Sequence, residues 1–508
     1  MTKKAKSTSG ELRIGWDNQD ITPARPVELI GQYYQRISRR VRDPLSVTAL
    51  AMEQRTSAGT AAAVMVSGDL LFITRDLQQE VRECIGSQAP GLDPKMVLIN
   101  GTHIHSGPAY FAPFRWWKPA AQVMPPDEIR ALWRDRITRA VVNAWNARRP
   151  AGVSDARVYA AAGFCRRTLH ADGRAVMYGD PGQTDFVGME AGHDHAVQML
   201  FTWDDREALT GVIVNVPCPS QVLEARYVVS ADFFGELRAR IRKTYGPQVQ
   251  MLAQVSAAGN QSPRDLPAQR HDDVNYWDES GVRAIARRLE HAVAEGYASA
   301  RECIERAPVL KHMVRDIALP VRRASTREYR GAAAEVKRLS ARYADAETAS
   351  RHLYARFVAD MHAGEKKKRH GPFDNKELDF VQLENAQAVI QRFDAQDGTP
   401  AFPVELHAVR VGDCAFVTNP FELYLDYGQI IQARSRAKRT FVVQLTGDAA
   451  GYLPTQRAVA GGGYGALIIN GHVGPDGGQA LVDASVRAIQ SLWEERDKRK
   501  SPIRKGRS

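Results

Sequence analysis

Two histidines lie two residues apart in the segment Gly101-Thr102-His103-Ile104-His105-Ser106-Gly107-Pro108. The apolar run before them, Lys95 to Asn100, predicts a short strand, and the Gly-Pro pair ends any regular element. Side chains at i and i+2 of a strand point to the same side, so His103 and His105 can address one point in space. They could serve there as a metal pair, or as one ligand beside one acid/base or oxyanion donor. Two histidines merely hydrogen-bonded in a turn are the alternative.

Polar side chains follow several other strand-like runs along the chain. They are Arg166 and Arg167 after the run 158–164, Asn260 to Ser262 after 249–255, Glu422 after 404–418, and Tyr452 with Tyr464 after 440–445. Ligands of open α/β sheets collect at the carboxyl ends of strands, so this repetition predicts the rim of one active site. Each residue alone also has a structural explanation, as a turn serine, a first-turn carboxylate or a packed ring.

The elements that position these residues alternate between strands and helices. Strands are expected at 46–54, 61–74, 95–100, 158–164, 196–203, 209–216, 249–255, 404–418 and 440–445, and helices at 74–85, 125–147, 423–435 and 477–496. This alternation predicts an α/β fold with mixed β-sheets flanked by helices. The polar, Ala-rich region 325–370 has helical periodicity and ends in the Lys366–His370 charge run, which predicts a surface helical hairpin or an arm that binds a partner.

Composition and charge exclude several function classes. With 44% hydrophobic and 25% charged residues over 508 positions, the chain is typical of a soluble globular protein, and no apolar run reaches the roughly 18 residues of a membrane span. The net charge of +11 arises in three short segments: Lys3 to Lys6, Lys366 to Arg369, and Lys498 to Arg507. We therefore expect solvated basic segments that contact anionic surfaces weakly, without specific nucleic-acid binding.

The domain organisation follows from the same patterns. We expect a basic flexible tail at 1–12, a single catalytic unit at 13–495 with a helical insertion at about 325–370, and a second basic tail at 496–508. The N-terminus lacks the apolar segment of a signal peptide, and the five cysteines are odd in number without CxxC spacing. Both features favour a cytoplasmic protein with reduced thiols. The sequence predicts no oligomeric state.

Taken together, four motifs resemble the neutral/alkaline (non-lysosomal) ceramidase family, in its catalytic domain. They are THIHSGP at 102–108 (family THTHSGP), GNQSP at 259–263 (family GDVSP), NPFE at 419–422 (family PGE), and AGY at 450–452 with Tyr464 twelve residues later in a Gly-rich segment. The resemblance extends thinly from about Ile14 to the closing helix. It implies a ceramidase-like catalytic domain without the C-terminal immunoglobulin-like domain that family chains usually carry.

The resemblance also implies a set of roles. His103, Glu422 and Tyr452 correspond to zinc ligands, His105 to a residue that orients or protonates, Arg166 and Tyr464 to groups that hold the amide or headgroup, and Ser262 to the serine implicated in amide cleavage. Zinc with an open position polarises a carbonyl and lowers the pKa of bound water to about 7. The implied activity is zinc-assisted hydrolysis of an N-acyl bond in a small-molecule or lipid substrate, as in sphingolipid metabolism.

One departure from the family pattern concerns the metal. The family's second zinc histidine lies at the end of the strand that here reads Val214 to Gln221, where no histidine is present. Cys218 lies within a residue of that position and is a candidate replacement ligand, because a thiolate binds zinc well. His193 and His195 could instead supply an imidazole, or form a surface loop pair.

Loss of the metal is the alternative. It leaves a metal-independent serine ester or amide hydrolase acting through Ser262 and His105, or a non-catalytic binding protein that retains the pocket. Asn260 also replaces the family's aspartate, which removes a charge beside Ser262.

Overall fold

The computed structural model describes residues 10–57, 59–111, 121–268, 273–366, 378–398 and 400–494. Most of the predicted N-terminal tail, all of the predicted C-terminal tail and Lys367 to His370 of the charge run lie outside these residues. The first strand, β1 (Leu12–Asp20), begins within the stretch that was expected to be a tail.

The first sheet has five strands in the order β7-β6-β5-β1-β8. The strands are β7 (Val97–Gly101), β6 (Gly59–Gly68), β5 (Ser46–Thr56), β1 and β8 (Arg149–Pro150). Helices α1 (Arg75–Gln88) and α2 (Pro126–Asn146) pack on its outer face through a buried cluster that includes Leu77, Trp133 and Ile137. Helix α2 begins with Pro126, Asp127 and Glu128, which suit a helix N-terminus because the proline fixes φ and the carboxylates oppose the helix dipole.

The second sheet has the order β17-β15-β14-β9 and is covered by two helices. Its strands are β17 (Gln250–Val255), β15 (Leu209–Val216), β14 (Ala196–Trp203) and β9 (Gly152–Tyr159), and its helices are α3 (Asp232–Tyr245) and α4 (Glu279–Ala300). Every residue of β14 is buried, because helices cover one side and another sheet the other. This explains why its sequence is a nearly continuous apolar run.

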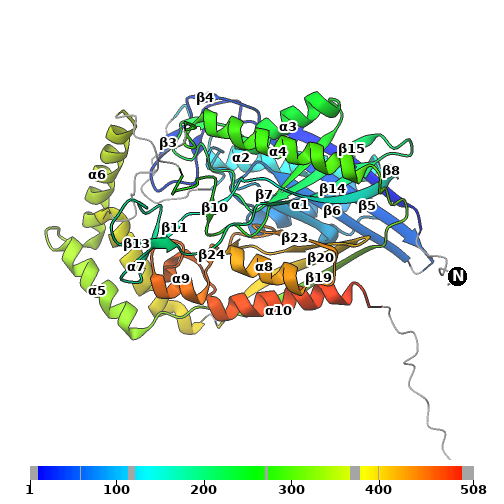
Figure 1. The fold of residues 1–508 in the computed structure, drawn as a ribbon. Coiled ribbons are helices and arrows are strands. Elements are labelled where there is room, and N and C mark those ends of the chain that lie inside the picture. The colour runs from blue at the N-terminus through cyan, green and yellow to red at the C-terminus, as the bar shows by residue number, and fades with distance from the viewer. Residues whose placement is uncertain are drawn as a thin grey trace, which may run out of the picture.

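The third sheet also has four strands, in the order β19-β20-β21-β23, and is also covered by two helices. Its strands are β19 (Leu310–Pro320), β20 (Ala401–Val411), β21 (Cys414–Thr418) and β23 (Arg439–Val443), and its helices are α8 (Leu425–Arg434) and α10 (Pro475–Ser491). Figure 1 shows α3 and α4 along the top of the molecule and α8 and α10 along the bottom, with the strands between them.

The inner faces of the three sheets share one central core. Leu98 and Met65 from the first sheet, Leu252 from the second, and Phe416 and Phe441 from the third belong to the same buried cluster. The rings of Phe416 and Phe441 stack with centroids 4.2 Å apart. Each sheet is therefore fixed relative to the other two by apolar burial.

Each sheet also contains one parallel pair of strands, and these pairs position the site. The pairs are β6 with β7, β15 with β17, and β21 with β23. Two short ladders lie beyond these strands: β10 (Phe164–Cys165) with β18 (Gln261–Ser262), and β22 (Glu422–Leu423) with β24 (Tyr452–Leu453). The loops that follow the parallel strands carry the predicted site residues except Arg166, which follows β10.

The expected strand 61–74 is shorter in the structure, because β6 ends at Gly68. Asp69 turns the chain there, with its carboxylate bound by Arg238 at 3.0 Å and by the Ser46 backbone N–H at 2.8 Å. The apolar residues at 70–73 pack in the core from a turn, which the apolar pattern could not distinguish from a strand.

The helical insertion is larger than predicted. It comprises three helices, α5 (Thr326–Ser340), α6 (Ala346–Lys366) and α7 (Asp379–Ala395). Helix α7 lies beyond the boundary expected at about 370. The three helices share a small apolar core that includes Leu353, Phe357 and Phe380. Figure 1 shows them at the left end of the molecule. Among the described residues, no helix is both long and apolar enough to cross a membrane.

The central core predicts the effect of removing one of its rings. Phe416→Ala is expected to lower the free energy of unfolding by about 3–5 kcal/mol, because it deletes a stacked ring and leaves a cavity between sheets. Urea denaturation measures this change. Val187→Ala, at a side chain that is 58% exposed, is the control and should change stability by less than about 0.5 kcal/mol. Equal effects of the two substitutions would contradict the three-sheet core.

Candidate active site

The two histidines meet directly after β7. His103 adopts a left-handed backbone conformation with φ of 61°, so a turn rather than the predicted strand presents the pair. The Nε2 atoms of His103 and His105 lie 3.3 Å apart. His103 Nδ1 lies 3.0 Å from the Leu71 carbonyl oxygen, and because a carbonyl only accepts, Nδ1 carries the proton in this bond. In a neutral His103, the lone pair is therefore on Nε2, the atom that faces the site.

Glu422 joins this pair from the third sheet. It lies on β22, which runs parallel to β24 with Glu422 opposite Tyr452. Its Oε2 is 3.3 Å from His103 Nε2. Burial disfavours the charge of Glu422, but the attraction of His103 and Arg166 and a hydrogen bond from Tyr452 outweigh burial, and the pKa of the carboxyl is lowered. Glu422 is therefore an ionised carboxylate in a buried position.

Arg166 brings a charged donor to the same point. Its Nη2 donates to the Tyr452 hydroxyl at 3.0 Å and to the Gly259 carbonyl at 2.9 Å, and lies 4.0 Å from Glu422 Oε2. Burial raises the pKa of Tyr452 well above its usual value, so the phenol keeps its proton. Arg166 and Tyr452 together form a pair of hydrogen-bond donors beside the carboxylate and imidazoles.

Tyr464 closes this side of the site. Its ring lies edge-on to Tyr452, with centroids 5.6 Å apart, and to Tyr33, with centroids 5.9 Å apart. The Gly-rich segment that carries it is required by close packing: at Gly463, with φ of 76°, an added Cβ would lie 2.3 Å from the Ala175 carbonyl oxygen. Tyr33 was not predicted as a site residue, although the two adjacent tyrosines at 33 and 34 are visible in the sequence.

Ser262 lies near this group but is not paired with a base. It sits on β18 opposite Phe164, is fully buried, and its Oγ accepts a hydrogen bond from the Arg264 backbone N–H at 3.2 Å. In the described part of the chain, no hydrogen bond joins Ser262 to His105. The neighbouring Asn260 accepts from the Leu425 backbone N–H at 3.0 Å, so its amide supports the start of α8.

The thiol of Cys218 contacts backbone carbonyls. Its Sγ lies 3.1 Å from the Ala162 carbonyl and 3.6 Å from the Pro219 carbonyl. Burial, with a smaller contribution from Asp232, raises the pKa of this thiol well above its usual value, so the thiol is protonated in the metal-free protein. Cys218 as a zinc ligand stays a prediction.

The other candidate imidazoles pair with each other outside this group. The rings of His193 and His195 stack with centroids 5.7 Å apart, and His193 Nδ1 accepts from the Cys165 backbone N–H at 2.9 Å.

The donors present do not complete a zinc centre. Over the described ranges there is no group of three or more His, Cys, Asp or Glu side chains that could hold a metal ion. The Tyr452 hydroxyl, a predicted ligand, is hydrogen-bonded to the positive guanidinium of Arg166. The zinc expected from the sequence therefore stays a prediction, and no chemical step below passes through it.

Sequence reasoning missed a second carboxylate and two further arginines. Glu224 Oε2 lies 3.6 Å from His105 Nδ1, and its Oε1 lies 2.9 Å from Arg264 Nη1. Arg36 donates to the backbone carbonyls of Ile30, His105 and Arg226 at 2.7–2.8 Å. Arg264 follows the Ser262 motif directly, which is the signal that could have identified it. Glu224 lies in a loop and Arg36 in the two-residue strand β3 (Arg36–Ile37), and neither has a comparable signal.

These charges affect His105. Burial is the largest cause that holds the pKa of His105 well below its usual range. Electrostatic repulsion by His103, Arg36 and Arg166 lowers the pKa further. The imidazole is therefore neutral near pH 7, and its Nε2 donates the hydrogen bond to the Nε2 lone pair of His103.

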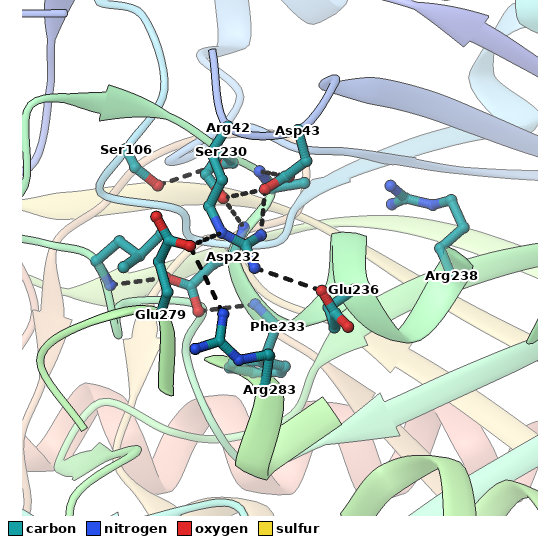
Figure 2. Close-up of polar contacts among 12 residues, drawn as sticks. Arg42, Asp43, Ser106, Ser230, Asp232, Phe233, Glu236, Arg238, Glu279 and Arg283 are labelled. Atoms are coloured by element: carbon teal, nitrogen blue, oxygen red, sulfur yellow. Dashed lines mark hydrogen bonds and ion pairs between the residues drawn. The ribbon is translucent and has the colours of Figure 1, made fainter. Parts of the chain in front are cut away.

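Figure 2 shows polar contacts among Asp43, Ser106, Ser230 and Asp232. Asp232 accepts from the backbone N–H groups of Leu223 and Phe233, both at 2.8 Å. Ser230 donates to Asp43 at 2.6 Å, and Ser106, just after His105, donates to the Ser230 carbonyl at 2.9 Å. The histidine loop and the Glu224 loop are thus bonded to each other and to a common buried support.

Comparison with known proteins rests on solved structures. No protein-family profile and no curated protein sequence matches the chain. A ceramidase complexed with C2 superposes with a TM-score of 0.65 at 16% identity, over 95% of this chain and 75% of that chain. The neutral ceramidase from Pseudomonas aeruginosa superposes with a TM-score of 0.65 at 17% identity, over 96% of this chain and 75% of that chain. This chain has the neutral ceramidase fold.

At these identities the likeness shows the ceramidase fold alone. The predicted fold class, mixed sheets flanked by helices in the manner of the ceramidase catalytic domain, is confirmed. The family resemblance drawn from the short motifs is supported at the level of the fold. The roles of individual residues stay predictions.

The placement of Cys218 predicts its reactivity. Iodoacetamide at about pH 8 should label Cys303, which is exposed, and leave Cys218 unlabelled in the native protein, because burial keeps the Cys218 thiol protonated. Mass spectrometry of the peptides measures both, and labelling after denaturation is the control. Rapid labelling of Cys218 that zinc prevents would instead support the thiol as a metal ligand.

Proposed function

We propose that this chain hydrolyses the amide bond of N-acyl compounds, with a lipid-like acyl group as in the substrates of ceramidases. The observation that carries the proposal is the convergence of two imidazoles and a buried carboxylate beside the Arg166–Tyr452 donor pair. Amide hydrolysis needs these three functions: an acceptor for the proton of the nucleophile, donors for the oxyanion, and an acid for the leaving amine. The shared fold of the ceramidases adds support.

Arg166 and Tyr452 would bind the acyl carbonyl oxygen. Arg166 carries a permanent charge, and Tyr452 stays protonated because burial raises its pKa, so both are donors at every pH near neutrality. As the carbonyl carbon becomes tetrahedral, its oxygen gains negative charge, and two fixed donors in a buried site stabilise that charge more than they stabilise the neutral carbonyl.

The imidazoles would move the proton. A water molecule attacks the carbonyl carbon and passes its proton to an Nε2 lone pair, and the imidazolium is stabilised by Glu422, 3.3 Å from His103 Nε2. The same proton then passes to the amide nitrogen as its bond to carbon breaks. The products are a carboxylic acid and an amine. Glu224, 3.6 Å from His105 Nδ1, would hold the second ring in place.

Replacing the central carboxylate tests this proposal. Glu422→Gln should lower kcat/KM for an N-acyl amine by at least about 100-fold, since it removes the charge that stabilises the imidazolium. Release of fatty acid from N-dodecanoyl amides, measured by chromatography, gives the rate. Glu302→Gln, at a surface carboxylate with a side chain 75% exposed, is the matched control and should be unchanged.

Two results in the same assay would change the interpretation. Wild-type protein that cleaves no N-acyl compound and binds one without turnover would show a binding protein that retains the pocket. Ser262→Ala identifies the nucleophile: turnover reduced to background assigns the attack to the serine, and retained turnover assigns it to water.

Metal removal tests the zinc prediction. If zinc assists the reaction as the sequence predicts, treatment with a chelator followed by gel filtration should abolish turnover, and added zinc should restore it. Elemental analysis of the purified protein gives the metal content alongside. A change in kcat/KM of less than about twofold, in protein that holds no zinc, would contradict the zinc prediction and support the metal-independent hydrolase.

A further inference from the structure

A groove with a volume of about 970 Å³ lies between helix α6 of the insertion and the segment 35–39. Ligand pockets in proteins typically enclose roughly 300–1,000 Å³, so the groove is large enough for a small organic molecule. None of the described residues that line it belongs to the candidate active site. We propose that this groove binds one long-chain carboxylate, such as a fatty acid, as a second ligand site. The inference does not depend on the proposed function.

Strand β3 separates the groove from the candidate active site. Its buried Arg36 donates to the His105 carbonyl at 2.8 Å, whereas its next residue, Ile37, lines the groove. Successive side chains of a strand point to opposite sides, which accounts for this division. Closer to the site, an added Cβ at Gly31 would lie 2.6 Å from the His105 ring. The groove is therefore a separate compartment beside the loop that contacts the histidines.

The part of the groove that α6 contributes is largely apolar. Residues three and four apart lie on the same face of a helix, so Tyr354 and Val358 line the groove together, with Ala355 beside them. Ile37 and the ring of Tyr227 complete this apolar lining. A hydrocarbon chain that covers these side chains removes both surfaces from water, and this burial favours binding.

The permanent charges of the groove are positive. Arg39 and Arg351 line it, and none of the described residues that line it is an aspartate or glutamate. The guanidinium of Arg39 lies over the Tyr227 ring, 4.2 Å from its centroid, so this charge is held beside the apolar lining. Arg351 lies 3.7 Å from Glu347 in an exposed pair on α6. Because exposed pairs of this kind are weak, a bound carboxylate can compete with Glu347 for the guanidinium.

The combination of apolar side chains and arginines fits an amphipathic anion. The hydrocarbon chain would cover the apolar lining, and the carboxylate would accept hydrogen bonds from the guanidinium groups. A bilayer surface fits less well, because membrane contact requires protruding apolar side chains. In the described ranges the large apolar side chains that are exposed are Val41, Tyr159, Val187 and Ile430, and none of them lies on α6 or at 35–39.

Two ligands with the same chain test the inference. Calorimetric titration of the full-length protein compares decanoate with decanol at pH 8, where the acid is ionised. Decanoate should bind at least about tenfold more tightly than decanol, because only the carboxylate gains hydrogen bonds from the two guanidinium groups. Equal affinity of the two compounds, or no binding of decanoate, would overturn the inference.

Filling the groove locates the binding site. Ala355→Trp introduces a large ring into the groove and should weaken decanoate binding at least about tenfold. Ala363→Trp, at an exposed alanine of the same helix outside the groove, is the matched control and should bind as the wild type does. Circular dichroism checks that both variants are folded. Binding that persists in Ala355→Trp and is lost in Arg166→Gln would place decanoate in the candidate active site and overturn the inference.

Removing the charges tests the carboxylate contact. The double variant Arg39→Gln, Arg351→Gln should reduce the preference for decanoate over decanol to about twofold or less. Arg356→Gln, at an exposed arginine of α6 outside the groove, should keep the preference of the wild type. A preference that survives the double substitution would contradict the proposed contact.

Two further outcomes separate this inference from its alternatives. Binding of phosphatidylglycerol vesicles without binding of decanoate would show a lipid-surface contact and overturn the single-ligand site. Decanoate binding that Ala355→Trp abolishes, in a protein that hydrolyses no amide, would support the groove and refute the proposed function. Amide hydrolysis without decanoate binding in the groove would give the reverse result.

Discussion

The contact between His103 and Glu422 is the constraint on which the rest of this site depends. The two residues are far apart in the sequence and follow strands of different sheets, β7 and β21, and their Nε2 and Oε2 atoms lie 3.3 Å apart because the carboxyl ends of those strands meet. The shared apolar core that contains Leu98, Leu252 and Phe416 fixes this meeting. A shift between sheets by one residue would move the two groups apart by roughly 3.3 Å, the rise of one strand residue.

Burial has opposite effects on the groups of this site, and together these effects set its charges. It keeps Tyr452 protonated and His105 neutral, yet it does not protonate Glu422, because His103, Arg166 and Tyr452 together outweigh the loss of solvent. The result is a fixed pattern in which the donors are two side chains and the acceptors are a carboxylate and the Nε2 lone pair of His103. Such a pattern needs little reorganisation when a substrate enters.

The sequence predicted the site residues that lie in short motifs at strand ends. It missed the residues that reach the site only through contacts between distant segments. Strand ends and short motifs identified His103, Arg166, Glu422 and Tyr452, and these side chains do come together. Cys218 matched in position, but the direction of its side chain is set by the packing of its loop against Ala162, which spacing does not reveal. Arg36 lies in a strand of two residues and Glu224 in a loop, both too short or irregular for periodicity, and they reach the site only through contacts between distant segments. Helix α7 was missed because the charge run before it was interpreted as the end of the insertion, so the apolar positions that follow were not assigned to a helix.

The backbone at His103 limits how this position can change in evolution. Its φ of 61° is costly for most side chains and tolerated best by glycine, asparagine and aspartate. A homologue that lacks this histidine can keep the same turn most easily with glycine, asparagine or aspartate. Valine or isoleucine would require a different backbone conformation of the loop. Inspection of this single column in related genes would separate lineages that preserve the chemistry from those that preserve only the scaffold.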